Sequence, residues 1–196
     1  MITVNRFKQA ISNSIKVKQE LLANETLILE IARATDVVVA AIKRGNRIIF
    51  AGNGGSAADS QHLAAEFVSR FEFDRPGLPA LSLSTDTSMI TAIGNDYGYE
   101  FLFLRQLQAQ ARPGDVFAGI TTSGKSANVL RAFEACKDLQ VTSIALCGLG
   151  GELEGKVDYV LRAPSGHTPR IQECHILIGH IICGLVEKEY FLGKDV

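Results

Sequence analysis

The chain has 196 residues, 46% of them hydrophobic and 21% charged, and a formal net charge of −1. These values are near globular averages and give no reason to expect a nucleic-acid or membrane partner. No apolar run approaches the roughly 20 residues that a membrane helix needs, and the first residues lack a signal-peptide pattern. We therefore expect a cytoplasmic protein with reduced cysteines that pack in the core; these are Cys136, Cys147, Cys174 and Cys183.

Two amphipathic helical patterns open the chain, over Asn5–Ala23 and Asn24–Arg44. Apolar residues recur in each at the spacing of one helix face. Two such helices ahead of the first strand are more than one sheet face needs, so we predict that they bury an apolar stripe against another subunit. The alternative is that they only cover the sheet of their own chain. We expect a single domain, with residues 1–45 serving oligomerisation and residues 46–196 forming an α/β core that binds the ligand.

From Arg47 onward, short apolar runs alternate with helical patterns. Apolar runs separated by helices predict a parallel sheet that is covered on both faces. The predicted strands are Ile48–Ala51, Ala80–Leu83, Val116–Ile120, Thr142–Leu146 and Tyr159–Arg162. The predicted helices are Ser56–Phe71, Thr87–Gly94, Glu100–Ala111, Ser126–Leu139, Gly151–Gly155 and Thr168–Tyr190. Ligands of such sheets bind beyond the carboxyl ends of the strands, which points to the loops Gly52–Ser56, Ser84–Thr87 and Thr121–Ser126.

The first predicted strand runs into a glycine-rich turn, Gly52-Asn53-Gly54-Gly55, and a helix begins at Ser56. Glycines let the backbone approach a ligand closely, and the start of a helix offers free N–H groups to an anion. His62 and Glu66, at i and i+4, share one face of that helix. The sequence thus predicts a phosphate cradle and a pair of proton-transfer or metal-binding groups on one short element.

A second loop, Thr121-Thr-Ser-Gly-Lys-Ser126, brings four hydroxyls to the start of another helix. Hydroxyls and helix-end N–H groups together can hold a phosphate. The loop lacks the glycine spacing of a P-loop, and the turn at Gly52 lacks the dinucleotide-binding pattern. Ordinary helix capping by Ser123 or Ser126 is the alternative. The combination with the glycine turn favours phosphate binding.

The last predicted helix carries Gln172, His175 and His180. Gln172 and His180 are about 80° apart around the helix and can point into one cleft, whereas His175 is about 140° from His180 and points elsewhere. For either histidine, a hydrogen-bonded position in the core is the alternative. If this helix and the helix with His62 and Glu66 flank one site, four polar side chains meet there.

Five segments carry these features together: Ala51–Asp59, Gln61–Glu66, Ala92–Gly98, Thr121–Ser126 and Arg170–His175. They resemble the phosphoheptose isomerases, also called sedoheptulose 7-phosphate isomerases, a family of sugar-isomerase (SIS) domain proteins. The resemblance covers nearly the whole chain, including the leading helices. It implies a flavodoxin-like three-layer α/β sandwich with a five-stranded parallel sheet. It also implies a homotetramer with active sites at the subunit interfaces.

The resemblance further implies the residues of the site. One zinc ion per subunit would be held by His62, Glu66, Gln172 and His180. The sugar phosphate would be bound by Asn53, Gly54, Gly55, Glu66, Asn95, Asp96, Thr121, Thr122, Ser123, Ser126 and Gln172.

The implied reaction is the ketose–aldose isomerisation of sedoheptulose 7-phosphate to D-glycero-D-manno-heptose 7-phosphate, the first step of ADP-heptose synthesis for the lipopolysaccharide core. Glu66 is the candidate base that removes a proton from C1, and His180 is the candidate partner that shuttles the hydroxyl proton. The sequence leaves open which of the two is base and which is acid, and whether zinc is catalytic or structural. Two alternatives belong to the same fold group: binding of a replication initiator protein, and sensing of a sugar phosphate by a regulatory module.

Overall fold

A five-stranded parallel sheet forms the middle of the computed structural model, which describes residues 3–193. The strands are β1 (Ile48–Gly52), β2 (Ala80–Ser82), β3 (Val116–Thr121), β4 (Thr142–Cys147) and β5 (Tyr159–Arg162). Their order, β2-β1-β3-β4-β5, is that of the flavodoxin-like fold, so the predicted fold class is confirmed. Every residue of β1 and β3 is buried, because helices cover both faces of the sheet.

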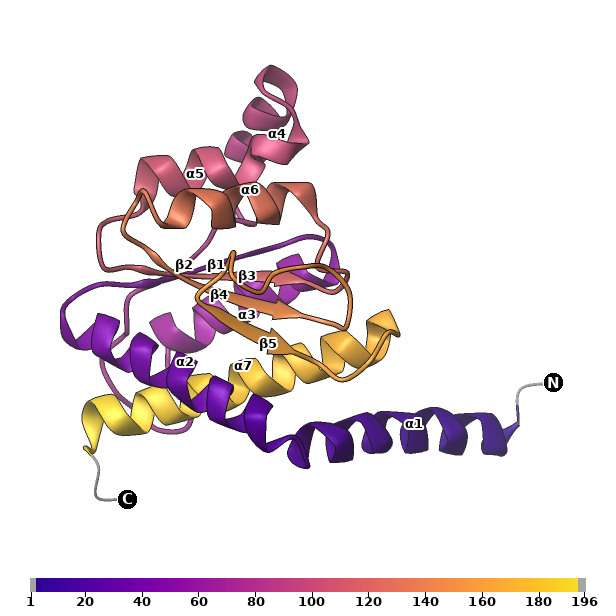
Figure 1. Ribbon diagram of the computed structural model, residues 1–196. Coiled ribbons are helices and arrows are strands. Elements are labelled where there is room, and N and C mark those ends of the chain that lie inside the picture. The colour runs from indigo at the N-terminus through magenta and orange to yellow at the C-terminus, as the bar shows by residue number, and fades with distance from the viewer. Residues whose placement is uncertain (1–2, 194–196) are drawn as a thin grey trace.

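Helices form one layer on each side of this sheet (Figure 1). One layer holds α2 (Glu25–Lys43), α3 (Gly55–Val68) and α7 (Thr168–Phe191), and the other holds α5 (Leu102–Gln110) and α6 (Ala127–Cys136). Side chains of a strand alternate between faces, so Ile48 and Phe50 belong to the first core while Ile49 and Ala51 belong to the second. The shared first layer brings α3 and α7 side by side, which places the site.

Four predicted helices differ clearly from the observed ones. The helices expected over Ser56–Phe71 and Ser126–Leu139 each end three residues earlier, at Val68 and Cys136. The helix expected from Glu100 begins as a 3-10 turn, η1 (Tyr99–Phe101), and continues as α5. The helix expected over Gly151–Gly155 is wrong, because both end glycines have positive φ, 79° and 77°, and Arg162 donates hydrogen bonds to the carbonyls of Gly148, Gly150 and Gly151. A loop fixed by a side chain therefore takes the place of a short helix.

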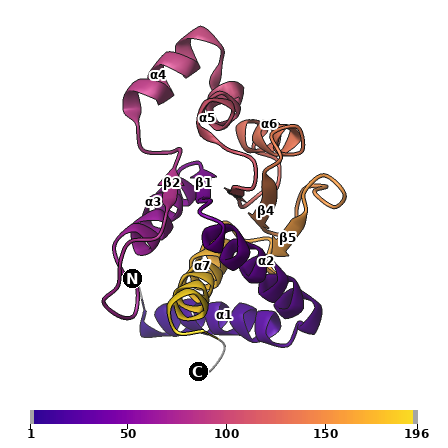
Figure 2. The same cartoon turned by 90° about the vertical axis from the view of Figure 1, so that its left-hand side faces the viewer.

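The first helix, α1 (Val4–Leu22), extends outward from the start of α2 and lies beneath α7 (Figures 1 and 2). Polar contacts attach it to α7: Ser14 donates a hydrogen bond of 2.5 Å to Glu173, and Arg170 donates one of 2.8 Å to the carbonyl of Ala10. Its apolar side chains Phe7 and Ile11 are 63% and 61% exposed. Oligomerisation through residues 1–45 stays a prediction. The expected domain covers residues 1–196, and its first two and last three residues lie outside the described residues.

All four cysteines are free and buried, as the sequence predicted. Burial raises the pKa of Cys136 and of Cys183 to about 12, so both thiols stay protonated and act as small apolar side chains. Among residues 3–193, no helix has both the length and the apolar character needed to cross a bilayer.

Candidate active site

The candidate site lies where the strand order changes direction. From β1 the chain leads to β2 on one side, while β3 and β4 continue on the other, and β1 pairs with β3 from Ile48 to Gly52. The loops that follow these two central strands therefore meet at the carboxyl edge of the sheet. Ligands of open α/β sheets bind in the crevice at this point. The two loops are the glycine turn before α3 and the hydroxyl-rich segment Thr121–Ser126.

The glycine turn brings backbone N–H groups to the start of α3. Gly54 is the N-cap of the helix, with a φ of 56° that suits glycine, and no side chain among residues 3–193 caps the first helical N–H groups. A Cβ added to Gly55 would collide with the side-chain amide of Gln172. The turn is thus an open helix N-terminus with an amide from α7 against its backbone, an arrangement suited to an anion.

The four hydroxyl-bearing residues of the second loop differ in their hydrogen-bond partners and in their exposure. The hydroxyl oxygens of Thr121 and Ser126 are 2.9 Å apart, and Ser123 accepts a hydrogen bond of 3.1 Å from the N–H of Lys125. Ser126 is the N-cap of α6, but its side chain makes no capping hydrogen bond. Thr122 is half-buried and Ser123 is exposed. Thr121 is only 2% exposed, so the hydroxyl-bearing residues of this loop that are at least partly open to a ligand are Thr122, Ser123 and Ser126.

An asparagine pair connects the two loops. Asn53 and Asn128 exchange side-chain hydrogen bonds of 2.9 Å, and the Tyr99 hydroxyl donates to Asn53 at 2.9 Å. Asn128, near the start of α6, is 3% exposed. Asn128 and Tyr99 were not predicted as site residues, because their contacts with Asn53 join positions 75 and 46 residues apart in the chain. The hydrogen bonds from Asn128 orient the side chain of Asn53, which is predicted to bind the substrate, and they hold the two loops together.

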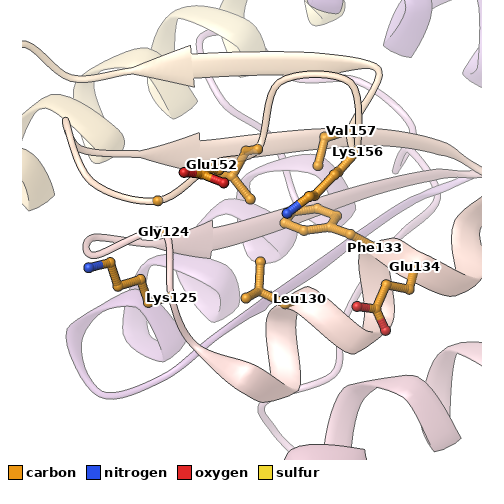
Figure 3. Close-up of a pocket in the computed structure, with 10 residues that line it drawn as sticks. Gly124, Lys125, Leu130, Phe133, Glu134, Glu152, Lys156 and Val157 are labelled. Carbon is orange, nitrogen blue, oxygen red and sulfur yellow. The ribbon is translucent and has the colours of Figure 1, made fainter.

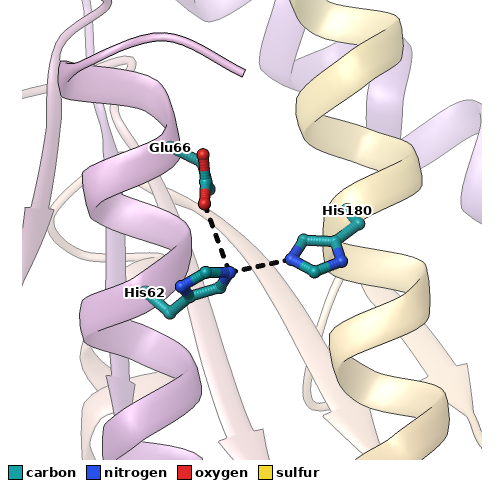
Figure 4. Close-up of side chains that lie close together, drawn as sticks. All are labelled: His62, Glu66 and His180. Carbon is teal, nitrogen blue, oxygen red and sulfur yellow. Dashed lines mark hydrogen bonds and ion pairs between the residues drawn. The ribbon is translucent and has the colours of Figure 1, made fainter. Parts of the chain in front are cut away.

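The proton-transfer and metal candidates converge between α3 and α7 (Figure 4). The Nε2 atoms of His62 and His180 are 2.9 Å apart, and Nε2 of His62 lies 3.2 Å from a carboxylate oxygen of Glu66. Ligand atoms of all three residues lie within 4.8 Å of one another. Two imidazole nitrogens and a carboxylate oxygen form a donor set that zinc accepts, with a fourth position left for an amide, water or substrate. The residues present therefore fit a divalent metal ion.

The fourth predicted ligand, Gln172, is placed differently from the other three. It lies about 12 Å before His180 along α7, and its amide contacts Gly55 at the start of α3. In this structure it belongs to the glycine turn, beside the predicted phosphate contacts. The helical spacing predicted that His175 points away from His180, and His175 is fully buried.

One turn before His62 on α3, Asp59 is a further carboxylate that the sequence analysis did not single out. Within the described residues, its buried oxygen Oδ2 has no hydrogen-bond partner. Burial raises the pKa of Asp59, and the nearby His62 opposes this shift.

Comparisons with known proteins identify the family. The model of the SIS domain family matches residues 11–148. Phosphoheptose isomerase 2 of Campylobacter jejuni is 58% identical over 184 residues, covering 93% of this chain and 91% of the relative. Phosphoheptose isomerase of Aneurinibacillus thermoaerophilus is 55% identical over 190 residues, covering 96% of both. The structure of a phosphoheptose isomerase from Francisella tularensis superposes with a TM-score of 0.90 at 36% identity, covering 96% of this chain and all of the other.

The chain belongs to the phosphoheptose isomerase family of SIS-domain proteins. The resemblance stated from the sequence motifs is thereby confirmed. Relatives at 58% and 47% identity carry this name, so the comparisons do not favour the initiator-binding or regulatory alternatives.

The resemblance to the phosphoheptose isomerases also assigned Asn95 and Asp96 to the substrate. They are exposed at the end of α4 (Thr87–Asp96), which stands out from the sheet, and they bond to each other at 2.8 Å (Figure 2). Their contact with the substrate stays a prediction.

A separate cavity of about 440 Å³ lies between α6 and the segment 151–157 (Figure 3). It adjoins the hydroxyl loop at Gly124 and Lys125, over a floor that includes Phe133. Its four charged side chains, two lysines and two glutamates, balance one another and are exposed. None of the site residues predicted for this isomerase family member lines it.

Proposed function

We propose that the protein isomerises sedoheptulose 7-phosphate to D-glycero-D-manno-heptose 7-phosphate. The observation that carries the proposal is that His62, Glu66 and His180 converge on one side of α3. The glycine turn before α3 and the loop Thr121–Ser126 are suited to bind a phosphate, and the chain is a member of the phosphoheptose isomerase family. A sugar phosphate needs both parts, one for its phosphate and one for its reacting carbons. The separation of the two parts along α3 suits a substrate whose phosphate and carbonyl are at opposite ends.

The phosphate end is assigned to the two loops. Asn53, Gly54 and Gly55 offer an amide and helix-end N–H groups, and Thr121, Thr122, Ser123 and Ser126 offer hydroxyls. Gln172 joins this group through its contact with Gly55. Neutral donors at a helix start bind a phosphate through hydrogen bonds and the helix dipole. Their distance from the reacting carbons means that they orient the substrate rather than react.

The proton transfers are assigned to Glu66 and His180. In this scheme the Glu66 carboxylate removes a proton from C1 of the ketose, which gives an enediol, and returns it at C2. His180 moves the hydroxyl proton between the oxygens on C1 and C2, so that the carbonyl passes from C2 to C1. Both side chains point into the same space between α3 and α7, which is the geometry that general acid–base catalysis requires.

A divalent ion, in this proposal zinc, would be held by His62, Glu66 and His180, with Gln172 as the fourth ligand when its side chain turns from Gly55. When bound, it would polarise the substrate oxygens and stabilise negative charge that develops on them. An amide is a weaker zinc ligand than an imidazole or a carboxylate, so this donor set is consistent with a loosely bound ion. Loose binding would leave the Glu66 carboxylate available to take up a proton during the reaction.

The active form in this proposal is a cytoplasmic homotetramer that serves ADP-heptose synthesis for lipopolysaccharide. The exposed apolar side chains of α1 and the exposed pair Asn95 and Asp96 support an assembled site. A neighbouring subunit would cover the apolar side chains of α1. The substrate bound by that subunit would lie near Asn95 and Asp96.

The test is to incubate the purified protein with sedoheptulose 7-phosphate and to follow the aldose product with added zinc, without it, and with a chelator. Turnover that depends on the metal supports the proposal. No product under any of these conditions, from a folded oligomer, would refute it and favour a binding or sensing role.

A further inference from the structure

A buried ion pair lies just beyond the His62–Glu66–His180 group. Nε of Arg75 donates to a carboxylate oxygen of Glu187 at 2.8 Å, and the two side chains are only 3% and 0% exposed. Glu187 lies on α7 about two turns after His180, and Arg75 lies in the segment that leads from α3 to β2. The Arg75–Glu187 pair therefore connects the two elements that supply the metal and proton-transfer candidates.

The guanidinium of Arg75 holds the carboxyl end of α3. It donates to the backbone carbonyls of Glu66 at 2.9 Å and of Phe67 at 2.7 Å, and to that of Ser69 at 3.1 Å. The last carbonyls of a helix have no partner within the helix, so such bonds fix where its final turn ends. One of these carbonyls belongs to Glu66 itself. Arg75 thus fixes the backbone from which the catalytic candidate projects.

The carboxylate of Glu187 holds the segment that contacts His180. It accepts hydrogen bonds from the N–H groups of Phe71 at 2.9 Å and of Glu72 at 2.8 Å. The ring of Phe71 packs against the imidazole of His180, with centroids 5.5 Å apart and planes tilted by 36°. Glu187 thus sets the backbone of the residue that limits how the His180 ring can turn.

We infer that Arg75 and Glu187 are positioning residues that keep α3 and α7 at the separation at which His62, Glu66 and His180 share one ligand. The inference rests on the proposed metal site. A buried ion pair often adds little net stability compared with apolar side chains of similar size, because both charges lose their water. The many bonds from this pair to the backbone around Glu66 and Phe71 give it a positional role that stability alone does not explain.

The test compares Arg75→Met, Glu187→Gln and the double variant Arg75→Met/Glu187→Met with the wild type. The double variant leaves no unpaired buried charge, so it is the one expected to stay well folded. Cobalt affinity is measured by competition with a chelator, the visible spectrum reports ligand geometry, and the melting temperature of the metal-free protein reports stability. We expect a 10- to 100-fold loss of cobalt affinity, the range seen when groups behind metal ligands are removed, together with a changed spectrum. We also expect kcat to fall while KM stays within about twofold of the wild type.

The matched control is Arg47→Met, which breaks another Arg–carboxylate pair, with Asp115 at 3.5 Å, at the amino ends of β1 and β3 and so away from the site. It should lower the melting temperature and leave cobalt affinity unchanged. Wild-type cobalt affinity and spectrum in the folded double variant would overturn the inference, as would an equal loss in Arg47→Met. A wild-type protein that binds no cobalt would instead overturn the metal site on which the inference rests.

Discussion

His62 and His180 are 118 positions apart in the chain, yet their Nε2 atoms lie 2.9 Å from each other. Two neutral imidazoles can approach in this way only if one of the facing nitrogens carries a proton. Glu66, 3.2 Å from the same nitrogen of His62, can only accept a hydrogen bond when ionised. By this chemistry the proton is assigned to Nε2 of His62, and Nε2 of His180 presents its lone pair. A metal ion that binds all three groups must displace that proton.

Metal content should therefore depend on both histidines. We expect the wild-type protein to hold one divalent ion per chain after mild dialysis and the His62→Ala/His180→Ala variant to hold none, as measured by elemental analysis. His167→Ala is the control, because His167 is an exposed histidine outside the group. Equal metal content in the wild type and the double variant would remove these residues as ligands.

Glu66→Gln should abolish turnover while the fold stays intact. The amide keeps the size of the side chain but cannot take up a proton, so kcat should fall at least about 100-fold. The measurement is the rate of aldose formation from sedoheptulose 7-phosphate, with circular dichroism to verify folding. Glu72→Gln is the control, since the Glu72 side chain pairs with Lys188 near the protein surface. Activity of Glu66→Gln within about threefold of the wild type would exclude Glu66 as the base.

The sequence predicted the sheet well because its central strands are buried on both faces. Runs such as Ile48–Gly52 and Val116–Thr121 contain almost only apolar residues, as parallel strands covered by helices on both faces do. Helix ends were predicted less well, since they depend on distant contacts. The end of α3 at Val68 follows from the bonds that Arg75 makes, and the loop at Gly151 follows from those of Arg162.

The site was predictable where its signal is local. The spacing of His62 and Glu66 places them on one helix face, and the glycine turn needs no distant partner to be recognised. The contact of His62 with His180 depends on how α3 packs against α7, and the role of Asn128 depends on a partner 75 positions away. Hydrogen bonds of this kind leave no periodic pattern in a single sequence.

The exposed face of α1 should be an interface between copies of the chain. We expect Ile11→Glu to shift the protein from its oligomer to smaller species, because a carboxylate cannot be buried without a partner. Light scattering coupled to size-exclusion chromatography measures the change, and activity should fall with it. Gln9→Glu adds the same charge to a polar position of this helix and should leave the size unchanged. If Ile11→Glu keeps the wild-type mass, the face has another role.

The last prediction concerns His175, which is fully buried on α7 and whose ring nitrogens have no hydrogen-bond partner among the described residues. Burial lowers the pKa of His175 to about 4, and the nearby carbonyl of Cys147 opposes the shift without reaching hydrogen-bond geometry. The ordinary pKa of histidine in an unfolded chain is about 6.5. Between these two values the unfolded chain binds a proton that the folded protein does not. The free energy of unfolding must therefore rise with pH across this window, and His175 should cost up to about 3 kcal/mol at pH 4 relative to pH 7.

Replacement of His175 by methionine should remove this cost. Methionine is close to histidine in size and has no polar nitrogen to bury, so the variant should be about as stable as the wild type at pH 7 and more stable than it near pH 4. Urea unfolding at a series of pH values gives the slope of the free energy of unfolding against pH. Between pH 4 and 6.5, this slope should correspond to nearly one proton fewer in the variant than in the wild type. Ile176→Met alters the neighbouring position, which packs against the same core, and should keep the wild-type slope. An unchanged slope in His175→Met would mean that His175 is protonated in the folded protein or finds a partner there.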